Sequence, residues 1–322
     1  MAKQEEKEAI IISVFFGGIN CNFKERNTLV EEFGIHTIAV DPINDPIFEH
    51  SNHYKFCFDG CGKTDGWMGF FFGAGLDFQC ETVVWFIKSL PKDKMSKIVI
   101  NAVGFSRGGL ACILLAQKIE YEFKELDIHV NLMLIDPIPG NLITLAKFDL
   151  FGFTWTSRSL DLSKLLKLKS VVAIYPHGIP NLSFHAPIIP IYGKHTHVTE
   201  EVILGWHISA LWKIPSLETK ISAFFMKDFL IRNGTKLTED LRGFNKWKKF
   251  YDIDPIILLD EMNNHCSDED HQSSTRYTHS LKNKKILYKP SGKYLNQLHH
   301  YLSADTNPLI PEEDFFLCFT QK

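Results

Sequence analysis

The stretch IVINAVGFSRGGLACILLA, residues 98–116, decides the fold class of this chain. It opens with a short apolar run rich in β-branched residues, which predicts a buried strand, and residues 110–123 then have the apolar spacing of a helix. Between the two, Gly104, Ser106 and Gly108 complete the pattern G-x-S-x-G. A serine between a buried strand and a helix is typical of a nucleophile elbow, whose tight turn exposes the hydroxyl.

The glycines of this turn have a steric reason. Side chains at positions 104 and 108 would collide with neighbouring elements, and Gly109 and Ala111 keep the helix start close to the sheet. The simpler alternative is an ordinary strand–turn–helix with a structural serine. Because a serine hydroxyl is a poor nucleophile at neutral pH, the elbow predicts a histidine base and an acid, in the chain order Ser, Asp or Glu, His.

Other apolar runs place the elbow within a larger sheet. Strands are expected at 9–16, 35–40, 98–103, 130–135 and 170–175, and further helices at 78–90, 202–212 and 221–232. This alternation predicts an α/β-hydrolase fold: a doubly wound, mostly parallel sheet with a helical C-terminal extension. We expect a hydrolase domain over 1–240 and an extension of unassigned role over 241–322. Chemistry in such sheets lies at the carboxyl ends of the strands.

The acid is expected at one of these strand ends. Asp136 closes the strand at 130–135 and lies 30 residues after Ser106, which places it beside the elbow strand. The next strand ends in Tyr175 and offers no acid, which favours Asp136 by elimination. Asp161 is an outside candidate, and a turn aspartate before proline is the structural alternative.

The base is sought among five histidines that follow the acid, namely His177, His185, His195, His197 and His207. His195 follows the apolar run IIPIY within the sequence GKHTH, and a loop there could carry it to the serine. We therefore expect His195 as the base, with His197 as the alternative. His207 lies in an apolar helical pattern typical of a core or interface histidine, and His177 would lie near the site without acting as the base.

Two backbone N–H groups are expected to bind the oxyanion that forms during acyl transfer. One belongs to Arg107, the residue after the nucleophile. The other belongs to the loop after the first strand, where Gly17 permits a close approach and the N–H of Gly18 or Ile19 would donate. The alternative is a plain glycine turn.

Composition excludes several other classes of protein. The 322 residues carry a formal net charge of −3 with no basic stripe, which argues against nucleic-acid binding. Seven cysteines without a repeated spacing predict no zinc site and a reducing compartment, and the proposed chemistry needs no metal or organic cofactor. The N-terminus lacks the apolar core of a signal peptide, and no run reaches the ~18 apolar residues of a membrane span.

Taken together, these segments resemble a known group, the DUF2235-like α/β hydrolases, which includes bacterial phospholipase effectors of the Tle1 type. The similar segments are FFGG at 15–18, GFSRGG at 104–109, IDP at 135–137 and GKHTH at 193–197. The group's elbow commonly reads GFSRGA, its strand-end acid maps to Asp136, and its Gly-x-His segment maps to Gly193-Lys194-His195. The likeness covers roughly residues 9–200. FFGG stands where the group has FDGT, and an acidic segment is missing at 175–180, which bears on substrate class more than on fold.

The resemblance implies a lipid or phospholipid ester as substrate, transient contact with a membrane surface, and an effector delivered into a host cell, where it would meet a host protein partner. The acidic, aromatic segment at 311–316 is similar to the translocation tails of type IV effectors. A catalytically silent α/β-hydrolase scaffold that binds a protein is the alternative, but Ser106, Asp136, His195 and the Gly17-Gly18 pair together favour an enzyme. A peptidase or thioesterase would use the same triad and remains open.

Overall fold

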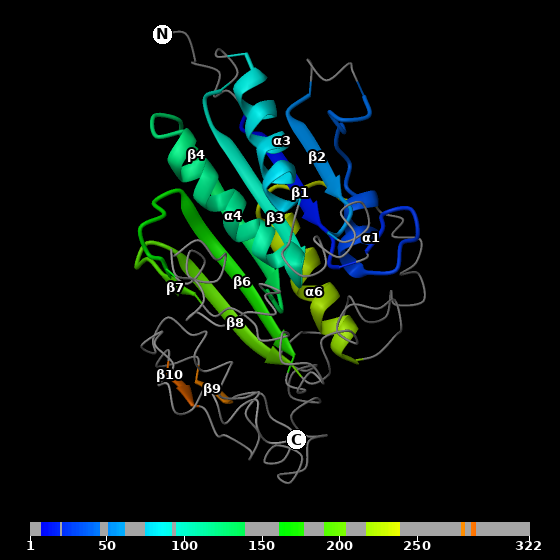
Figure 1. Ribbon diagram of the computed structural model, residues 1–322, viewed down its shortest axis with the longest axis vertical. Helices are drawn as coiled ribbons and strands as arrows, with labels where there is room; N and C mark the ends of the chain where they lie inside the picture. The colour runs from blue at the N-terminus through cyan, green and yellow to red at the C-terminus, as the bar shows by residue number, and fades with distance from the viewer. Residues whose placement is uncertain are drawn as a thin grey trace, which may run out of the picture.

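The computed structural model describes residues 8–19, 21–45, 51–61, 75–91, 95–138, 161–176, 190–203, 217–238, 278–280 and 285–287. Its centre is a six-stranded sheet in the order β2-β1-β3-β4-β6-β8, and every neighbouring pair is parallel (Figure 1). The strands are β1 Ile10–Phe16, β2 His53–Phe58, β3 Ile98–Phe105, β4 Ile128–Ile135, β6 Leu168–Pro176 and β8 His197–Ile203. The predicted doubly wound parallel sheet is confirmed.

Helices cover both faces of this sheet. They are α1 Leu29–Ile35, α3 Leu76–Ser89, α4 Arg107–Glu122 and α6 Leu217–Arg232. The apolar side chains of α3 and α4 share one buried cluster with one face of the strands, and those of α1 and α6 share a second cluster with the other face. Figure 1 shows α4 on the near side of the sheet and α6, in yellow, behind it. Two small sheets accompany the main one: β5 Asp161–Leu162 with β7 Ile191–Tyr192, and β9 Thr278–Ser280 with β10 Lys285–Leu287.

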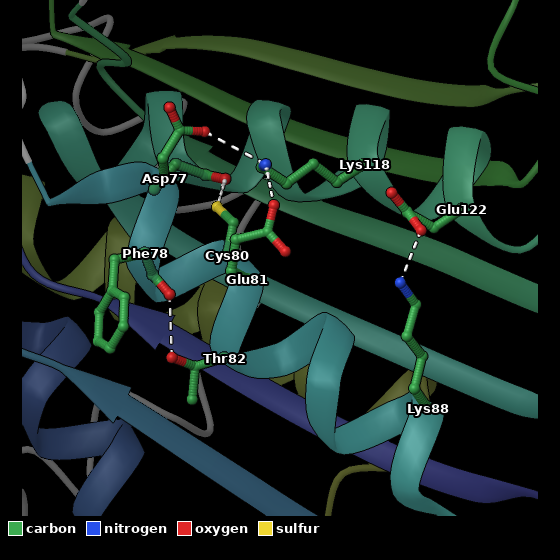
Figure 2. A network of polar contacts seen from close by, with 9 residues as sticks. Asp77, Phe78, Cys80, Glu81, Thr82, Lys88, Lys118 and Glu122 are labelled. Carbon is green, nitrogen blue, oxygen red and sulfur yellow. Dashed lines mark hydrogen bonds and ion pairs between the residues drawn. The ribbon is translucent and has the colours of Figure 1, made fainter.

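Helices α3 and α4 share buried apolar side chains on the side that faces the sheet. Ion pairs also link the two helices (Figure 2). Lys118 of α4 pairs with Asp77 and Glu81 of α3, and Lys88 pairs with Glu122 at 2.7 Å. These side chains are partly exposed, so each pair contributes at most about 1 kcal/mol. The buried apolar side chains beneath them supply most of the attraction between the two helices.

A row of polar side chains crosses the opposite face of the sheet. Ser13, Asn101, Asn131 and Ser170 occupy the same level on β1, β3, β4 and β6. Asn131 donates to Asn101 at 3.0 Å, Ser170 donates to Asn131 at 2.8 Å, and Asn101 donates to the Thr235 hydroxyl at 2.9 Å. Because buried polar groups need partners, this row fixes where the chain leaves α6 over the sheet.

One expected strand was wrong, and one expected helix was wrong at its start. Thr28 and Glu31 form a capping box that starts α1, and this helix extends to Ile35. Of the strand expected at 35–40, isolated bridges at Thr37 and Val40 are what the structure shows. The outer strand of the sheet beside β1 is instead β2, which was not expected from the sequence. The expected helix at 202–212 begins inside β8, and 204–212 lies outside the described residues.

The segment 241–322 is described only at β9 and β10, so the division of the chain at residue 240 stays a prediction. Within the described ranges, no helix is both long enough and apolar enough to cross a bilayer.

Candidate active site at the carboxyl edge of the sheet

Ser106 lies between the end of β3 and the first residue of α4, where the chain reverses sharply. Its backbone has φ 56° and ψ −119°, a conformation that residues with a side chain rarely adopt. Such a residue costs of order 1–3 kcal/mol and persists only where the surroundings enforce it. The turn predicted from G-x-S-x-G therefore has the strained backbone of a nucleophile elbow, but Ser106 is only 2% exposed, whereas an exposed hydroxyl was expected.

Close packing around the elbow explains its glycines. A Cβ on Gly104 would overlap the carbonyl of Gly108, and a Cβ on Gly108 would overlap the carbonyl of Phe16 at the end of β1. A Cβ on Gly109 would lie 2.9 Å from Cβ of Pro137. Glycine at position 109 thus makes room for the turn that follows Asp136. The DUF2235-like hydrolases, which the sequence resembles, commonly have alanine at this position.

Asp136 lies beside Ser106 across neighbouring strands. Phe105 and Ile135 are partners in the β3–β4 register. The Ser106 N–H donates to the Ile135 carbonyl at 2.9 Å, and the Ile138 N–H donates to the Ser106 carbonyl at 3.1 Å. Residues on either side of Asp136 therefore hydrogen-bond to both the N–H and the carbonyl of the serine.

The carboxyl group of Asp136 belongs to a fully buried residue with φ 44°. Within the described ranges, the residues other than glycine with positive φ are Arg26, Ser106 and Asp136. Two of these three unusual backbones thus belong to the expected nucleophile and acid. Burying an acidic side chain is costly unless its environment favours it, and strain combined with burial is typical of a functional site.

The loop after β1 runs alongside the elbow. The N–H of Gly17 donates to the Phe58 carbonyl at 3.0 Å, so this group is already engaged. A Cβ on Gly18 would lie 2.6 Å from Cδ1 of Phe105, which shows that the aromatic ring rests on the Gly18 backbone. Gly17 and Gly18 therefore lie next to the elbow, and Gly18 or Ile19 stays the predicted oxyanion donor of this loop.

Arg107 contributes a charge as well as a backbone N–H. It is the first residue of α4, where N–H groups lack a partner within the helix and the helix dipole favours negative charge. Its side chain is fully buried, and this burial lowers the pKa of the guanidinium to about 10. Arg107 thus remains a cation at neutral pH, and it follows Ser106 directly in the sequence.

The structure does not bring His195 to this site, which corrects the expected base. His195 precedes β8, whose first residue pairs with Ser170 near the start of β6. Its Nε2 lies 2.8 Å from the carbonyl oxygen of Leu165 in the chain before β6. The carboxyl edge, at the level of Glu201, is six residues or about 20 Å further along the strand, so His195 lies at the amino edge and cannot reach Ser106.

The alternatives share this problem. His197 is exposed and starts β8 at the level of Ser170, well below the carboxyl edge. Asp161 is exposed and accepts hydrogen bonds from the N–H and hydroxyl of Ser163 at 2.9 and 2.6 Å, which is the geometry of a turn. The other three candidate histidines, His177, His185 and His207, lie outside the described residues.

Four of the described cysteines are poor competitors of Ser106 as nucleophiles. Burial raises the pKa of the Cys21 and Cys57 thiols to about 12, and it raises the pKa of Cys80 and Cys112 further. All four stay neutral and weakly nucleophilic at physiological pH. Among the residues that the structure describes, no cluster of His, Cys, Asp and Glu is arranged to hold a metal ion.

Comparison with known proteins bears on the fold. No protein-family model and no curated protein matches the chain. An uncharacterized protein from Pseudomonas aeruginosa superimposes with a TM-score of 0.53 at 14% identity, over 83% of this chain and 50% of that one. The chain therefore spans about half the length of that protein.

Two further solved structures superimpose less closely. The Tle1 effector bound to the VgrG spike of the Type 6 secretion system has a TM-score of 0.37 at 14% identity, over 62% of this chain and 50% of the other. The RedJ thioesterase from Streptomyces coelicolor has a TM-score of 0.32 at 11% identity, over 62% and 83%. At these identities, likeness speaks to the fold alone.

The parallel sheet, the strained serine after β3 and the aspartate after β4 together decide the architecture. This is an α/β-hydrolase fold. In an α/β hydrolase the triad lies along the carboxyl edge, in the order serine, acid, histidine. Among the described residues, Ser106 and Asp136 lie at that edge of the sheet in that order.

Proposed function

We propose that this α/β-hydrolase fold belongs to a serine hydrolase that cleaves a carboxylic ester through an acyl-enzyme. The observation that carries the proposal is the backbone of Ser106: φ 56° at the end of a buried strand, directly before a helix and beside buried Asp136. An ordinary structural serine has no need for this strain, whereas a nucleophile elbow requires it to hold the serine at the turn between strand and helix.

The base in this proposal is His207. The Gly-x-His pattern that resembles the family occurs twice, at Gly193-Lys194-His195 and at Gly205-Trp206-His207. The second copy follows the last residue of β8 by only a few positions, and β8 ends at the carboxyl edge. His177, directly after the end of β6, is the competing candidate. The order Ser106, Asp136, His207 is that of an α/β hydrolase.

The proposed steps follow from these positions. His207 takes the proton of the Ser106 hydroxyl as the oxygen attacks the ester carbonyl, and Asp136 stabilises the resulting imidazolium. The N–H group of Arg107 and that of Gly18 or Ile19 bind the oxyanion. The histidine then gives its proton to the departing alcohol. Water hydrolyses the acyl-Ser106 ester by the same route and releases the acid.

A lipid or phospholipid ester is the proposed substrate class, on the strength of the family resemblance around the elbow. The same resemblance supports transient contact with a membrane surface, delivery as a bacterial effector and a host protein partner. Tle1, whose fold is similar in part, is an effector that binds a VgrG spike. For this chain, a protein partner of that kind is a proposal.

Hydrolysis of p-nitrophenyl esters with acyl chains of two to sixteen carbons (roughly the range that separates esterases from lipases) and release of fatty acid from phospholipid vesicles test the proposal. The purified full chain is expected to hydrolyse at least one class, and Ser106→Ala is expected to lose about 10³-fold or more of kcat while keeping its fold. Failure of the folded wild type on every substrate would favour the silent scaffold that binds a partner.

A further inference from the structure

The loop after β1, residues 17–19 and 21–23, is held from one side by the residues at the end of β2. We propose that Asp59 and Gly60, the residues that follow β2, are positioning residues that hold this β1 loop in the geometry needed to bind the oxyanion. The inference rests on the proposed serine-hydrolase function and adds to it two residues that do not touch the substrate.

Three successive residues of the β2 end bind the loop. The Phe58 carbonyl accepts the N–H of Gly17 at 3.0 Å, and the Gly60 N–H donates to the Cys21 carbonyl at 3.0 Å. Between them, Oδ1 of Asp59 accepts the N–H of Phe23 at 2.9 Å. The residues at the end of β2 thus hydrogen-bond to the start, the middle and the end of the β1 loop.

Gly60 also fixes the position of the Gly18 peptide by direct contact. A Cβ on Gly60 would overlap the carbonyl oxygen of Gly18 and would lie 3.2 Å from the Cys21 nitrogen. On another side of Gly18, the ring of Phe105 leaves no room for a Cβ. Gly18 is therefore packed between Gly60 and the elbow residue Phe105. The peptide group whose carbonyl touches Gly60 is the one that carries the N–H of Ile19, so the orientation of that N–H relative to Ser106 depends on both contacts.

A second carboxylate holds the same loop from α1. Glu31 accepts the N–H of Asn22 at 2.7 Å and also that of Thr28 at 2.9 Å. The adjacent N–H groups of Asn22 and Phe23 are therefore bound by carboxylates from two different elements. Because Glu31 also caps α1, its loss would disturb the fold, whereas Asp59 is partly exposed and offers a cleaner test.

The expected consequence is specific to the transition state. An oxyanion donor must lie 2.7–3.1 Å from the developing charge, and loss of one such donor costs about 10²–10³-fold in kcat. A loop that shifts by a fraction of an ångström weakens the donor without removing it. We therefore expect a loss in kcat of about tenfold to 100-fold, with little change in KM, because the ground-state carbonyl is hardly bound by these groups.

The test compares Asp59→Ala with Asp59→Asn and with the matched control Asp161→Ala. Asp161 also accepts a backbone N–H at 2.9 Å, from Ser163, but at the amino edge. Ester hydrolysis and the rate of fluorophosphonate labelling are measured on the full chain, together with thermal unfolding. Asp59→Ala is expected to lower kcat and the labelling rate in parallel, Asp59→Asn to restore most of both through its amide oxygen, and Asp161→Ala to leave both unchanged.

The outcomes separate this inference from the proposed function. A folded Asp59→Ala variant with the wild-type kcat, or one that changes KM alone, would overturn the positioning role while leaving the serine hydrolase in place. A folded wild type that neither labels nor hydrolyses any ester overturns both. Gly60→Ala serves as the second variant, and it is expected to lose more kcat than Asp59→Ala because the Gly18 peptide must move to admit the Cβ.

Discussion

The two edges of the parallel sheet differ in how their turns are built. At the carboxyl edge, Ser106 and Asp136 have positive φ, are buried, and lie where glycine neighbours leave no space for a Cβ. At the amino edge, His195 and Asp161 are exposed and make ordinary hydrogen bonds to a backbone carbonyl and to a turn serine. Both edges thus carry an aspartate that was a candidate for the acid, and of these four described residues Ser106 and Asp136 have the strained backbones.

This difference shows which chemical groups the fold is built to present. Strained backbones and buried charges lower stability, so they persist where the surrounding structure is selected to hold them. An exposed histidine on a loop has no such cost and needs no functional reason. The predictions below test whether the difference between the edges is also a difference in activity.

The largest contrast is expected between two histidines. His207→Ala should lower kcat for ester hydrolysis by about 10³-fold or more because no base then accepts the Ser106 proton. His195→Ala should stay within about twofold of wild type, since His195 bonds Leu165 at the other edge. Steady-state kinetics on the two folded variants and on His177→Ala decide the assignment. A large loss of kcat in His195→Ala would contradict the placement of the active site at the carboxyl edge of the sheet.

The acid should give the next largest effect. Asp136→Asn keeps the shape of the side chain but removes the charge that stabilises the imidazolium, so kcat should fall by about 10²–10⁴-fold. Asp161→Asn is the matched change at the amino edge and should leave kcat unaltered. Both variants are compared at pH 7 to 9, with circular dichroism to verify the fold. Equal kinetics for the two variants would remove Asp136 from the triad.

Two glycine substitutions should show whether a loss of activity is separate from a loss of stability. Gly109→Ala places a Cβ 2.9 Å from Pro137 and should lower the free energy of unfolding by about 1–2 kcal/mol and kcat by about tenfold. Gly234→Ala, at φ 84° near Ile11, should cost about 1 kcal/mol through backbone strain alone. Urea unfolding and kinetics measure both quantities. A loss of kcat in Gly234→Ala as large as that in Gly109→Ala would count against this account.

The smallest effect concerns pH and stability at the amino edge. The hydroxyl and then the N–H of Ser163 lower the pKa of the Asp161 carboxyl below its ordinary value. A lowered pKa in the folded state stabilises the protein above the unfolded pKa of about 3.9 and ceases to do so as pH falls through the folded value. Asp161→Asn should therefore be slightly less stable than wild type at pH 7, and the gap should narrow near pH 3. Urea unfolding at the two pH values checks this, and a gap independent of pH would contradict it.

Local signals made the elbow predictable from the sequence. The apolar run into Gly104, the G-x-S-x-G pattern and the helix after it are all contiguous, and the structure places β3 and α4 where they were expected. Asp136 was predictable for the same reason, since it directly follows a buried strand. Neither prediction needed to know the order of the strands.

The base was not predictable in this way. The edge of the sheet at which a late histidine lies depends on which segment forms the last strand. The sequence HVTEEVI of β8 carries charged residues and was not recognised as a strand, since a strand at the end of the sheet has a neighbour on only one side. With the run before His195 taken as the strand, the amino edge was mistaken for the carboxyl edge.

The strand expected at 35–40 was wrong because a helix signal before it was overlooked. Thr28 and Glu31 have the spacing of a capping box, which marks the start of a helix.

The central claim, that Ser106 is an active nucleophile, is tested most directly by treating the full chain with a fluorophosphonate and mapping the adduct by peptide mass spectrometry. The account predicts one stoichiometric adduct on Ser106 and none on Ser106→Ala. A folded protein that stays unlabelled, or one that carries the adduct on another residue, would contradict it.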